Sequence, residues 1–411
     1  MLVVRYFMSL LPHSVFLGSS VAALCLASLA ASAETTRAAF GGVALASYGS
    51  DQESLLESYP VAARLILCGQ PALARAIDCA ESAPNLSAQV AQAFEGNEFK
   101  NFEVTFERFD ANQTEGLVLV PVVTRESLVS ADEGNAYSYS YRVYVDLMLL
   151  RFRPGEVQFI SSFPYILNYF DVRDRRLTQD ETADVFRLIY LDDSLGFNLF
   201  EEVARVAADK MDPNIESGNY AQVTDVSLSD EVAGILEQTY PRDTWRQQIG
   251  QFLSSNIVDR SGVSLLPSRL SGEVTDKMRI VFADGNRDIS VPVPSYEIKL
   301  DVERFVRHEQ PSGSEQIICF IVAARLRVDD AFGEEKANIR FVRKRESCGA
   351  TDRGTTREDK MYFPESLFSL LTNIAEQFDG SIDRQFVSGH VDESTQAINQ
   401  INALNTLLFD K

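Results

Sequence analysis

The chain has 411 residues, 45% of them hydrophobic, and its 59 acidic residues against 38 basic ones give a formal net charge of -21 at pH 7. A surface this acidic repels phosphate backbones and anionic lipid headgroups, which argues against nucleic-acid binding and against membrane attachment through a basic patch. The length and the ordinary hydrophobic content indicate a globular protein of two or three domains.

Residues 1–33 have the features of a secretory signal peptide. A single charge at Arg5 precedes an apolar run at residues 15–30, and Ala31-Ser32-Ala33 has the small-residue pattern of a cleavage site. Polar residues interrupt the run, and it is shorter than the about 20 residues that a membrane-spanning helix needs. We therefore expect cleavage near Ala33, a periplasmic or secreted protein, and no transmembrane segment in the mature chain.

The cysteines that remain after this cleavage are even in number, which in an oxidising compartment predicts two disulfides. Cys319 and Cys348 flank a strand-turn-strand pattern and are equidistant from its centre at Gly333-Glu334, so they can face each other across two antiparallel strands. Cys68 and Cys79 lie in one helical stretch broken by Gly69-Gln70-Pro71, as in a stapled helical hairpin. No Cys-x-x-Cys pair is present, so we expect no zinc site.

Residues 211–219 are interpreted as a linker, because Asp212-Pro213-Asn214 and Ser217-Gly218 break any regular element. The linker divides the mature chain into a first domain, residues 34–210, and a second domain, residues 220–411. Each is predicted to run helix, strand, hairpin, helix.

In the second domain, Thr244-Trp245-Arg246-Gln247 has the form of a capping box, and apolar residues recur at helical spacing from Trp245 to Ile257. Pro364 is expected to open another amphipathic helix. Alternating or continuous apolar runs predict strands at 263–266, 278–282, 289–293, 296–303, 317–328 and 337–345.

In the first domain, the patterns predict strands at 43–48, 102–106, 137–152 and 157–170, a helix at 86–94 and another helix containing Phe200, Val203, Ala204 and Ala207. Phe106-Glu107-Arg108-Phe109 is similar to Val302-Glu303-Arg304-Phe305 in the second domain, which suggests a duplication. The expected fold class is α+β, with two similar domains that are each a mainly antiparallel sheet covered by amphipathic helices.

Tyr137, Tyr139 and Tyr141 alternate with two serines. They could form an aromatic platform for a sugar, base or peptide, or they could pack across strands on a pleated surface. The period of two continues into Val143 and Val145, which favours packing.

The sequence predicts no catalytic, cofactor-binding or metal-binding residues. His308 and His390 are the histidines of the mature chain, and no G-x-S-x-G, H-E-x-x-H, P-loop or G-x-G-x-x-G motif accompanies them. The paired carboxylates at Asp192-Asp193 and Asp329-Asp330 are interpreted as solvated turns.

The helix at 244–257, then Arg260-Ser261-Gly262-Val263 and Tyr296-Glu297-Ile298-Lys299-Leu300, then the hairpin at 317–345 and the helix from Pro364, resemble a bacterial envelope module. This α/β module is shared by auxiliary components of ABC-type lipid transporters and by curli-type export assembly proteins. These families usually carry a lipidated N-terminal cysteine, which is missing here at the expected cleavage point. The resemblance implies a periplasmic role in envelope transport or assembly, and no functional residues can be carried over.

These observations lead to the hypothesis of a non-enzymatic periplasmic binding or scaffold protein that works with a protein partner in the cell envelope. Because the surface is acidic, a basic or mixed-charge partner is expected. Two alternatives remain open: a secreted hydrolase using Asp and Glu, and a small-ligand receptor that binds between the two domains.

Overall fold

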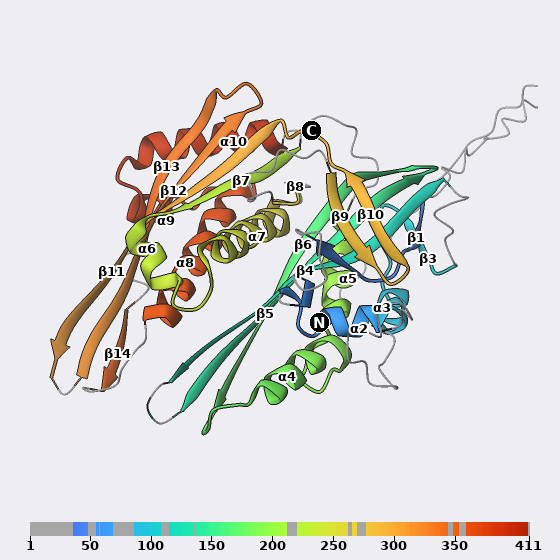
Figure 1. Ribbon diagram of the computed structural model, residues 1–411. Coiled ribbons are helices and arrows are strands. Elements are labelled where there is room, and N and C mark those ends of the chain that lie inside the picture. The colour runs from blue at the N-terminus through green and yellow to red at the C-terminus, as the bar shows by residue number, and fades with distance from the viewer. Residues whose placement is uncertain are drawn as a thin grey trace, which may run out of the picture. The chain divides into compact units, whose positions relative to one another are not determined.

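The protein contains both helices and strands, arranged around two sheets, so the predicted α+β class is confirmed (Figure 1). The predicted signal peptide, and the predicted linker beyond Met211, lie outside the described residues. The computed structural model describes residues 36–47, 55–56, 58–68, 86–107, 115–132, 134, 136–211, 220–261, 265–268, 277–313, 315–343, 348–352 and 359–409.

The first sheet, sheet A, is built on three long antiparallel strands: β4 (Gly116–Asp132), β5 (Tyr137–Arg153) and β6 (Glu156–Arg173). The other strands of sheet A are β1 (Arg37–Phe40), β2 (Ala44–Ser47), β3 (Glu103–Thr105), β9 (Lys277–Phe282) and β10 (Gly285–Ser290). The strand order is β2-β9-β10-β6-β5-β4-β1-β3, and β2 also pairs with β4.

The pairing between β2 and β4 closes six of these strands into a ring, β4-β5-β6-β10-β9-β2. Alternate side chains of the ring point inward and form a separate apolar core, which includes Val120, Met148 and Ile280. Gly41 lies against this core, because a Cβ atom there would stand 2.6 Å from Cγ1 of Val118. The strands therefore form a small barrel with a packed interior.

The β9-β10 hairpin was predicted at residues 278–282 and 289–293, and it forms with its second strand shifted toward the turn. By sequence the hairpin belongs to the predicted second domain, but by hydrogen bonding it completes the barrel of the first-half strands. Figure 1 shows it beside β6. The domain boundaries at 34–210 and 220–411 stay a prediction.

The second sheet, sheet B, has the order β13-β12-β11-β7-β8, with β14 paired to the far end of β12. Its strands are β7 (Ala221–Leu228), β8 (Leu265–Leu266), β11 (Tyr296–Ser312), β12 (Glu315–Asp330), β13 (Glu335–Arg343) and β14 (Cys348–Asp352). One face carries cross-strand ion pairs such as Arg325 with Glu303 at 2.8 Å. The other face is apolar and lies under helices, with Phe305 stacked on Phe363 at 4.6 Å between ring centroids.

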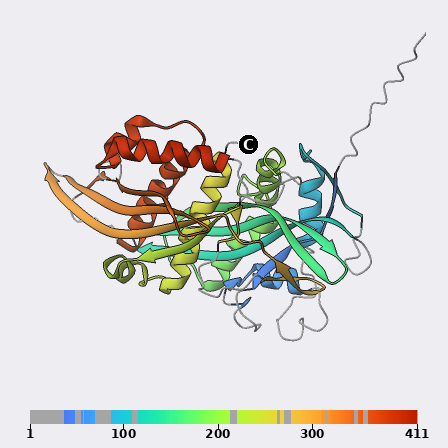
Figure 2. The same cartoon turned by 90° about the horizontal axis from the view of Figure 1, so that it is seen from above.

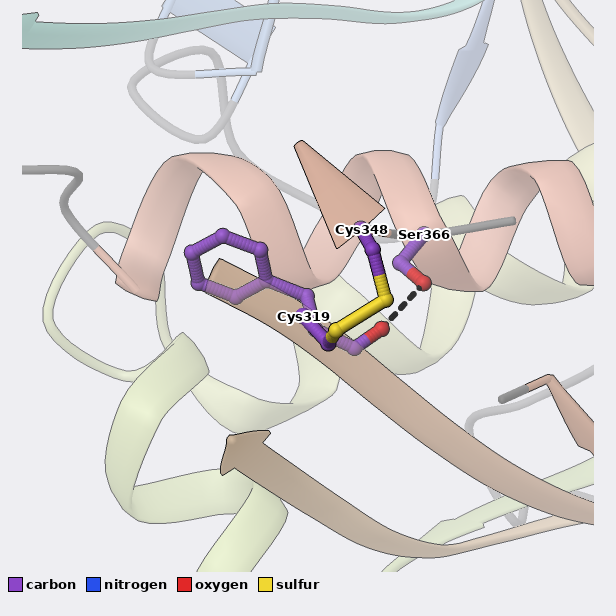
Figure 3. The surroundings of a disulfide bond; sticks show 4 residues. Cys319, Cys348 and Ser366 are labelled. Atoms are coloured by element: carbon purple, nitrogen blue, oxygen red, sulfur yellow. Dashed lines mark hydrogen bonds between the residues drawn. A yellow bond between two sulfur atoms is a disulfide. The ribbon is translucent and has the colours of Figure 1, made fainter. Parts of the chain in front are cut away.

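The sulfur atoms of Cys319 and Cys348 lie 2.03 Å apart, at disulfide distance, and the two residues are directly opposite each other in the β12-β14 ladder (Figure 3). The predicted pairing across antiparallel strands is therefore present, although Cys348 starts a separate strand and does not continue β13. Next to the bridge, the Ser366 hydroxyl donates to the carbonyl oxygen of Phe320 at 2.7 Å. Cys79 lies outside the described residues, so its bridge to Cys68 stays a prediction.

Helices of the first half are α2 (Ala62–Leu67), α3 (Leu86–Glu95), α4 (Gln179–Leu191) and α5 (Leu199–Ala208). Those of the second half are α6 (Asp230–Leu236), α7 (Arg242–Ser261), α8 (Asp359–Ala375), the short η1 (Glu376–Phe378), α9 (Arg384–His390) and α10 (Ser394–Phe409). In Figure 2 the red C-terminal helices lie along one side of the orange strands of sheet B, and α8 and α10 contact β12 and β13.

Two predicted helix starts are wrong. The helix α7 begins at Arg242, directly after Pro241, so Thr244 lies within its first turn and does not cap it. The carbonyl of Pro241 accepts the Trp245 N–H at 3.2 Å instead. The helix α8 begins at Asp359, and Pro364 therefore lies inside it.

The strands β4 and β11 occupy equivalent places in the two halves. Each pairs in parallel with a preceding strand, β2 or β7, and the pairing stops where a bulge begins. The bulge lies between Val123 and Arg125 in β4, and between Val302 and Arg304 in β11. By this topology Val123 takes the place of Val302. Phe106 follows the short strand β3, and residues 108–109 lie outside the described residues, so the match of 106–109 with 302–305 stays a prediction.

Candidate interaction surface

Among the described strands of the barrel, β6 has the longest stretch of edge without a strand partner. β10 pairs with β6 at Val157 and Gln158, and no other described strand pairs with that edge of β6. Tyr220 and the short strand β8 then contact the next part of β6. The Tyr220 hydroxyl donates to the Ile160 carbonyl at 3.0 Å, and the Ser162 hydroxyl donates to the Leu265 carbonyl at 2.9 Å.

From Ile166 to Arg173 no described residue hydrogen-bonds to this outer edge. Two apolar side chains of this segment are exposed, Phe170 at 56% and Val172 at 53%. They lie two residues apart on a strand, so both point to the same face, where the exposed Asn168 continues the row. An unpaired strand edge with apolar side chains is a template for pairing with another chain.

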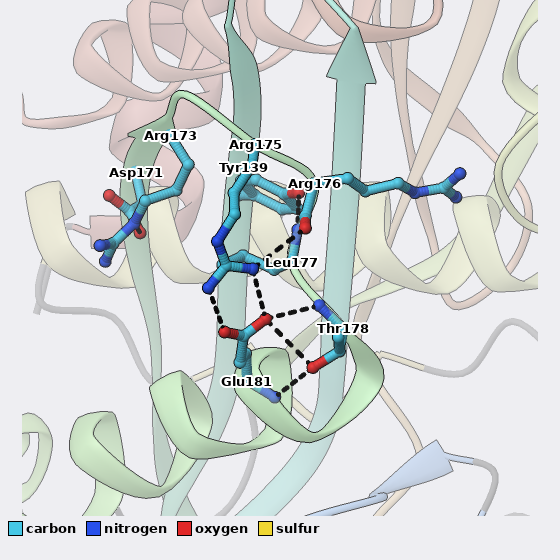
Figure 4. Close-up of polar contacts among 8 residues, drawn as sticks. All are labelled: Tyr139, Asp171, Arg173, Arg175, Arg176, Leu177, Thr178 and Glu181. Atoms are coloured by element: carbon cyan, nitrogen blue, oxygen red, sulfur yellow. Dashed lines mark hydrogen bonds and ion pairs between the residues drawn. The ribbon is translucent and has the colours of Figure 1, made fainter.

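Several polar contacts connect the end of β6 to α4 (Figure 4). Thr178 and Glu181 form a capping box, in which the Thr178 N–H donates to the Glu181 carboxylate at 2.9 Å. Arg175 binds the same carboxylate through both terminal nitrogens, and this contact holds the Glu181 pKa at about 2. The Leu177 N–H donates to the Tyr139 hydroxyl at 2.6 Å, which ties the joint to β5.

Charged side chains surround this end without forming a basic patch. Arg173 pairs with Asp171 at 2.7 Å, whereas Arg176 extends away from the cluster in Figure 4. The surface that β6 offers therefore combines an apolar centre with mixed charges.

The corresponding edges of β4 and β11 are less suited to strand addition. On β4, the Tyr240 hydroxyl both donates to the Leu128 carbonyl and accepts from the Leu128 N–H, so it fills the edge there. On β11, the segment beyond the bulge carries charged or polar side chains at Arg307, His308 and Glu309. Charge on an edge strand is a usual protection against pairing.

Two buried carboxylates are the best candidates for catalytic groups among the described residues, and the sequence analysis predicted neither of them. Glu126 on β4 accepts from the Val61 N–H at 2.9 Å and the Ala62 N–H at 2.6 Å, whereas Asp146 on β5 has no hydrogen-bond partner among the described residues. Burial raises the pKa of each to about 7.

These carboxylates cannot act as a pair. Glu126 faces α2 and α4, on the side where Val145 and Leu147 join the main core. Asp146 alternates with those residues along β5 and shares the barrel side with Met148. A substrate would have to reach both faces of the sheet, so the acid and base roles of a two-carboxylate hydrolase are not available to them.

A polar layer lies where sheet A meets α7 and α8. Arg142 is 2% exposed, binds Glu365 at 2.5 Å and lies 4.6 Å from the ring centroid of Phe368. On α7, Gln248 is fully buried, and neither amide atom has a hydrogen-bond partner among the described residues. The Tyr144 hydroxyl is also without one. Such unpaired groups normally hold water or a ligand.

The tyrosines of β5 pack within the fold. Tyr139 and Tyr141 are buried, their ring centroids lie 6.3 Å apart, and Tyr141 meets Phe186 of α4 edge-on at 5.2 Å. Only Tyr137 is partly exposed. The packing interpretation of this row is confirmed.

His308 and His390, the two histidines of the predicted mature chain, lie on different elements. His308 lies on the exposed end of β11, and His390 ends α9 with its ring stacked on Phe386 at 4.4 Å. The turn interpretation holds for Asp192-Asp193, where Asp192 accepts from the Ser194 N–H. It is wrong for Asp329-Asp330, because both residues end β12 and their side chains, each 16% exposed, pair with Lys299 and Lys336. Within the described part of the chain, no three His, Cys, Asp or Glu residues gather as a metal site.

No helix of the described residues combines the length and the apolar character needed to cross a membrane. In comparisons with known proteins, no family model and no curated protein matches the chain.

Proposed function

We propose that the protein is a non-enzymatic binding or scaffold protein of the periplasm, acting in envelope transport or assembly, and that it receives an extended segment of a protein partner along β6. The observation that carries this proposal is the open edge from Ile166 to Arg173 with Phe170 and Val172 exposed beside it. A segment of this length can accept a strand of about five or six residues.

The joint between β6 and α4 supports the proposal. Because the Thr178 capping box and the Arg175–Glu181 pair fix the end of β6, little conformational freedom is lost when a partner strand adds. The backbone supplies hydrogen bonds, and the two apolar side chains select residues of the partner that pack diagonally against them. A partner with mixed or basic charge suits the net charge of -21 and should associate faster at low salt.

The test is a pull-down from a native envelope extract with the mature protein at two ionic strengths. Val172→Lys places a charge on the edge and should abolish recovery of the partner, whereas Val306→Lys on the exposed part of β11 is the matched control and should not. Slower amide hydrogen exchange at Ile166 to Arg173 in the complex would locate the added strand. Recovery that is equal for both variants, or exchange that is unchanged, would rule out the β6 edge.

The hydrolase alternative predicts turnover in a screen of esterase, glycosidase and peptidase substrates that disappears when a single Asp or Glu is replaced. The receptor alternative is favoured by one observation, the unpaired amide of Gln248 in the buried layer. It predicts that Gln248→Leu weakens binding of a small polar ligand to the isolated protein, while Val172→Lys leaves that binding unchanged.

A further inference from the structure

The turn between β12 and β13 presents one phenylalanine almost entirely to solvent. Phe332 is 97% exposed, and the next most exposed large hydrophobic side chain among the described residues is Val293 at 77%. The Ala331 N–H donates to the Ser295 carbonyl at 2.9 Å, so the segment that carries Val293 lies beside the turn. Two segments distant in sequence thus bring their exposed apolar residues to one end of sheet B.

This turn is locked by its own polar groups. One carboxylate oxygen of Asp330 accepts from the N–H groups of Phe332 and Glu334, both at 2.9 Å. Gly333 supplies the positive φ of 80° that the turn requires, and its N–H donates to the Asp330 carbonyl. Lys336 then bridges Asp330 at 3.1 Å and Glu334 at 2.7 Å. The exposed ring is therefore carried on a pre-organised loop.

An exposed ring on a rigid loop adds nothing to the packing of this chain, but it is the usual form of an anchor in protein recognition. A rigid aromatic residue buries a large area in a partner's pocket and loses little conformational entropy.

The charges around the ring indicate which partner it fits. Asp329, Asp330, Glu334 and Glu335 flank it, against Lys336 and Lys299, and Lys299 pairs with Asp329 at 2.8 Å. Anionic lipid headgroups and nucleic acids would be repelled, whereas basic side chains around an apolar pocket would be complementary.

We propose that Phe332 and Val293 form an anchor that inserts into an apolar pocket, rimmed by basic side chains, on a protein partner. The proposal rests on the proposed function and adds a second contact surface to it. Truncation of such an anchor is expected to weaken binding by about 30-fold. Because the ring is 97% exposed, the truncation leaves the melting temperature unchanged.

The experiment places the photo-crosslinking residue p-benzoylphenylalanine at position 332 of the full chain and irradiates it in a native envelope extract. The captured protein is identified, purified and titrated against the wild type and three variants. Phe332→Ser should bind about 30-fold more weakly, Val293→Ser should be weakened less, and Leu407→Ser, with a comparably apolar exposed residue on α10, should bind like the wild type. The crosslinked peptide should lie in an apolar pocket with Lys or Arg at its rim.

The outcomes separate this inference from the proposed function. If the captured protein binds Phe332→Ser as tightly as the wild type, or if position 332 yields no adduct or an adduct with a second copy of the chain, the anchor is refuted. If Val172→Lys nevertheless abolishes recovery of the partner in the pull-down, the β6 proposal still stands. Binding of the wild type to phosphatidylglycerol vesicles that Phe332→Ser abolishes would refute the protein pocket in favour of a membrane.

Discussion

Replacing Asp146 with asparagine should stabilise the protein at neutral pH, which is unusual for a change in a buried residue. Asp146 is 5% exposed and has no hydrogen-bond partner among the described residues, and burial alone raises its pKa from 3.8 to about 7. A carboxyl group whose pKa rises on folding contributes its full stability below pH 4 and loses it as the pH rises through 7. The shift corresponds to about 4 kcal/mol at pH 8.

Asp146→Asn has the shape of the protonated acid and cannot ionise. Urea unfolding in non-reducing buffer should therefore find the variant and the wild type equally stable at pH 4, and the variant more stable by about 4 kcal/mol at pH 8. Glu126→Gln is the matched contrast, because Glu126 also has a pKa of about 7 but accepts two backbone N–H groups with its two oxygens. A glutamine amide has only one acceptor oxygen, so Glu126→Gln loses one of these hydrogen bonds and should be less stable than the wild type at pH 4. A difference between Asp146→Asn and wild type that does not change with pH would refute the buried ionisation.

The double variant Cys319→Ser, Cys348→Ser removes a bridge with a sequence separation of 29, which should lower the free energy of unfolding by roughly 3 to 4 kcal/mol. Its melting temperature should be lower than that of the oxidised wild type and equal to that of the reduced wild type. Gly41→Ala should cost about 1 to 3 kcal/mol because its Cβ meets Val118 in the barrel, whereas Gly96→Ala, with nothing within 4 Å, should be near neutral by the same melt. A fragment of residues 34–210 lacks the β9-β10 hairpin and should aggregate unless a peptide of residues 277–291 is added, as light scattering would show.

Periodicity predicted the strands β5, β6 and β12 well, because each has a long alternating or continuous apolar pattern. It predicted only the first part of β11, to residue 303, because the strand continues to Ser312 through charged and polar residues. It missed β4, although β4 is 17 residues long and central to the barrel. Its apolar run from Leu117 to Val123 contains Pro121, which lowers any strand prediction. Pro121 lies between the part of β4 that pairs with β1, Leu117 to Leu119, and the part that pairs with β2, Val122 and Val123, so neither of these ladders includes it. Long-range pairing of this kind leaves no local signal in the sequence.

Capping patterns were less reliable than periodicity. Thr244 and Gln247 have the spacing of a capping box, and so do Thr178 and Glu181, but only the second pair caps a helix. The difference lies upstream, since Pro241 already fixes the chain for a helix that starts at Arg242. The buried carboxylates Glu126 and Asp146 could not be recognised either, because their neighbours in sequence do not reveal which face of a strand is covered.

The open edge of β6, unlike the closed barrel, has a cause that can be read from the sequence. The parallel register places Ile289 opposite Val157 and Ser290 opposite Gln158, so a longer β10 would bring Pro292 and Pro294 alongside β6. Proline has no N–H to give to a ladder, and the chain leaves the barrel there to begin β11. The same two prolines that end the hairpin therefore leave the rest of β6 without a strand partner from this chain. A strand of another chain can pair with this open edge where the side chains of β6 do not prevent it. Phe170 and Val172 are such side chains, because both are apolar and exposed.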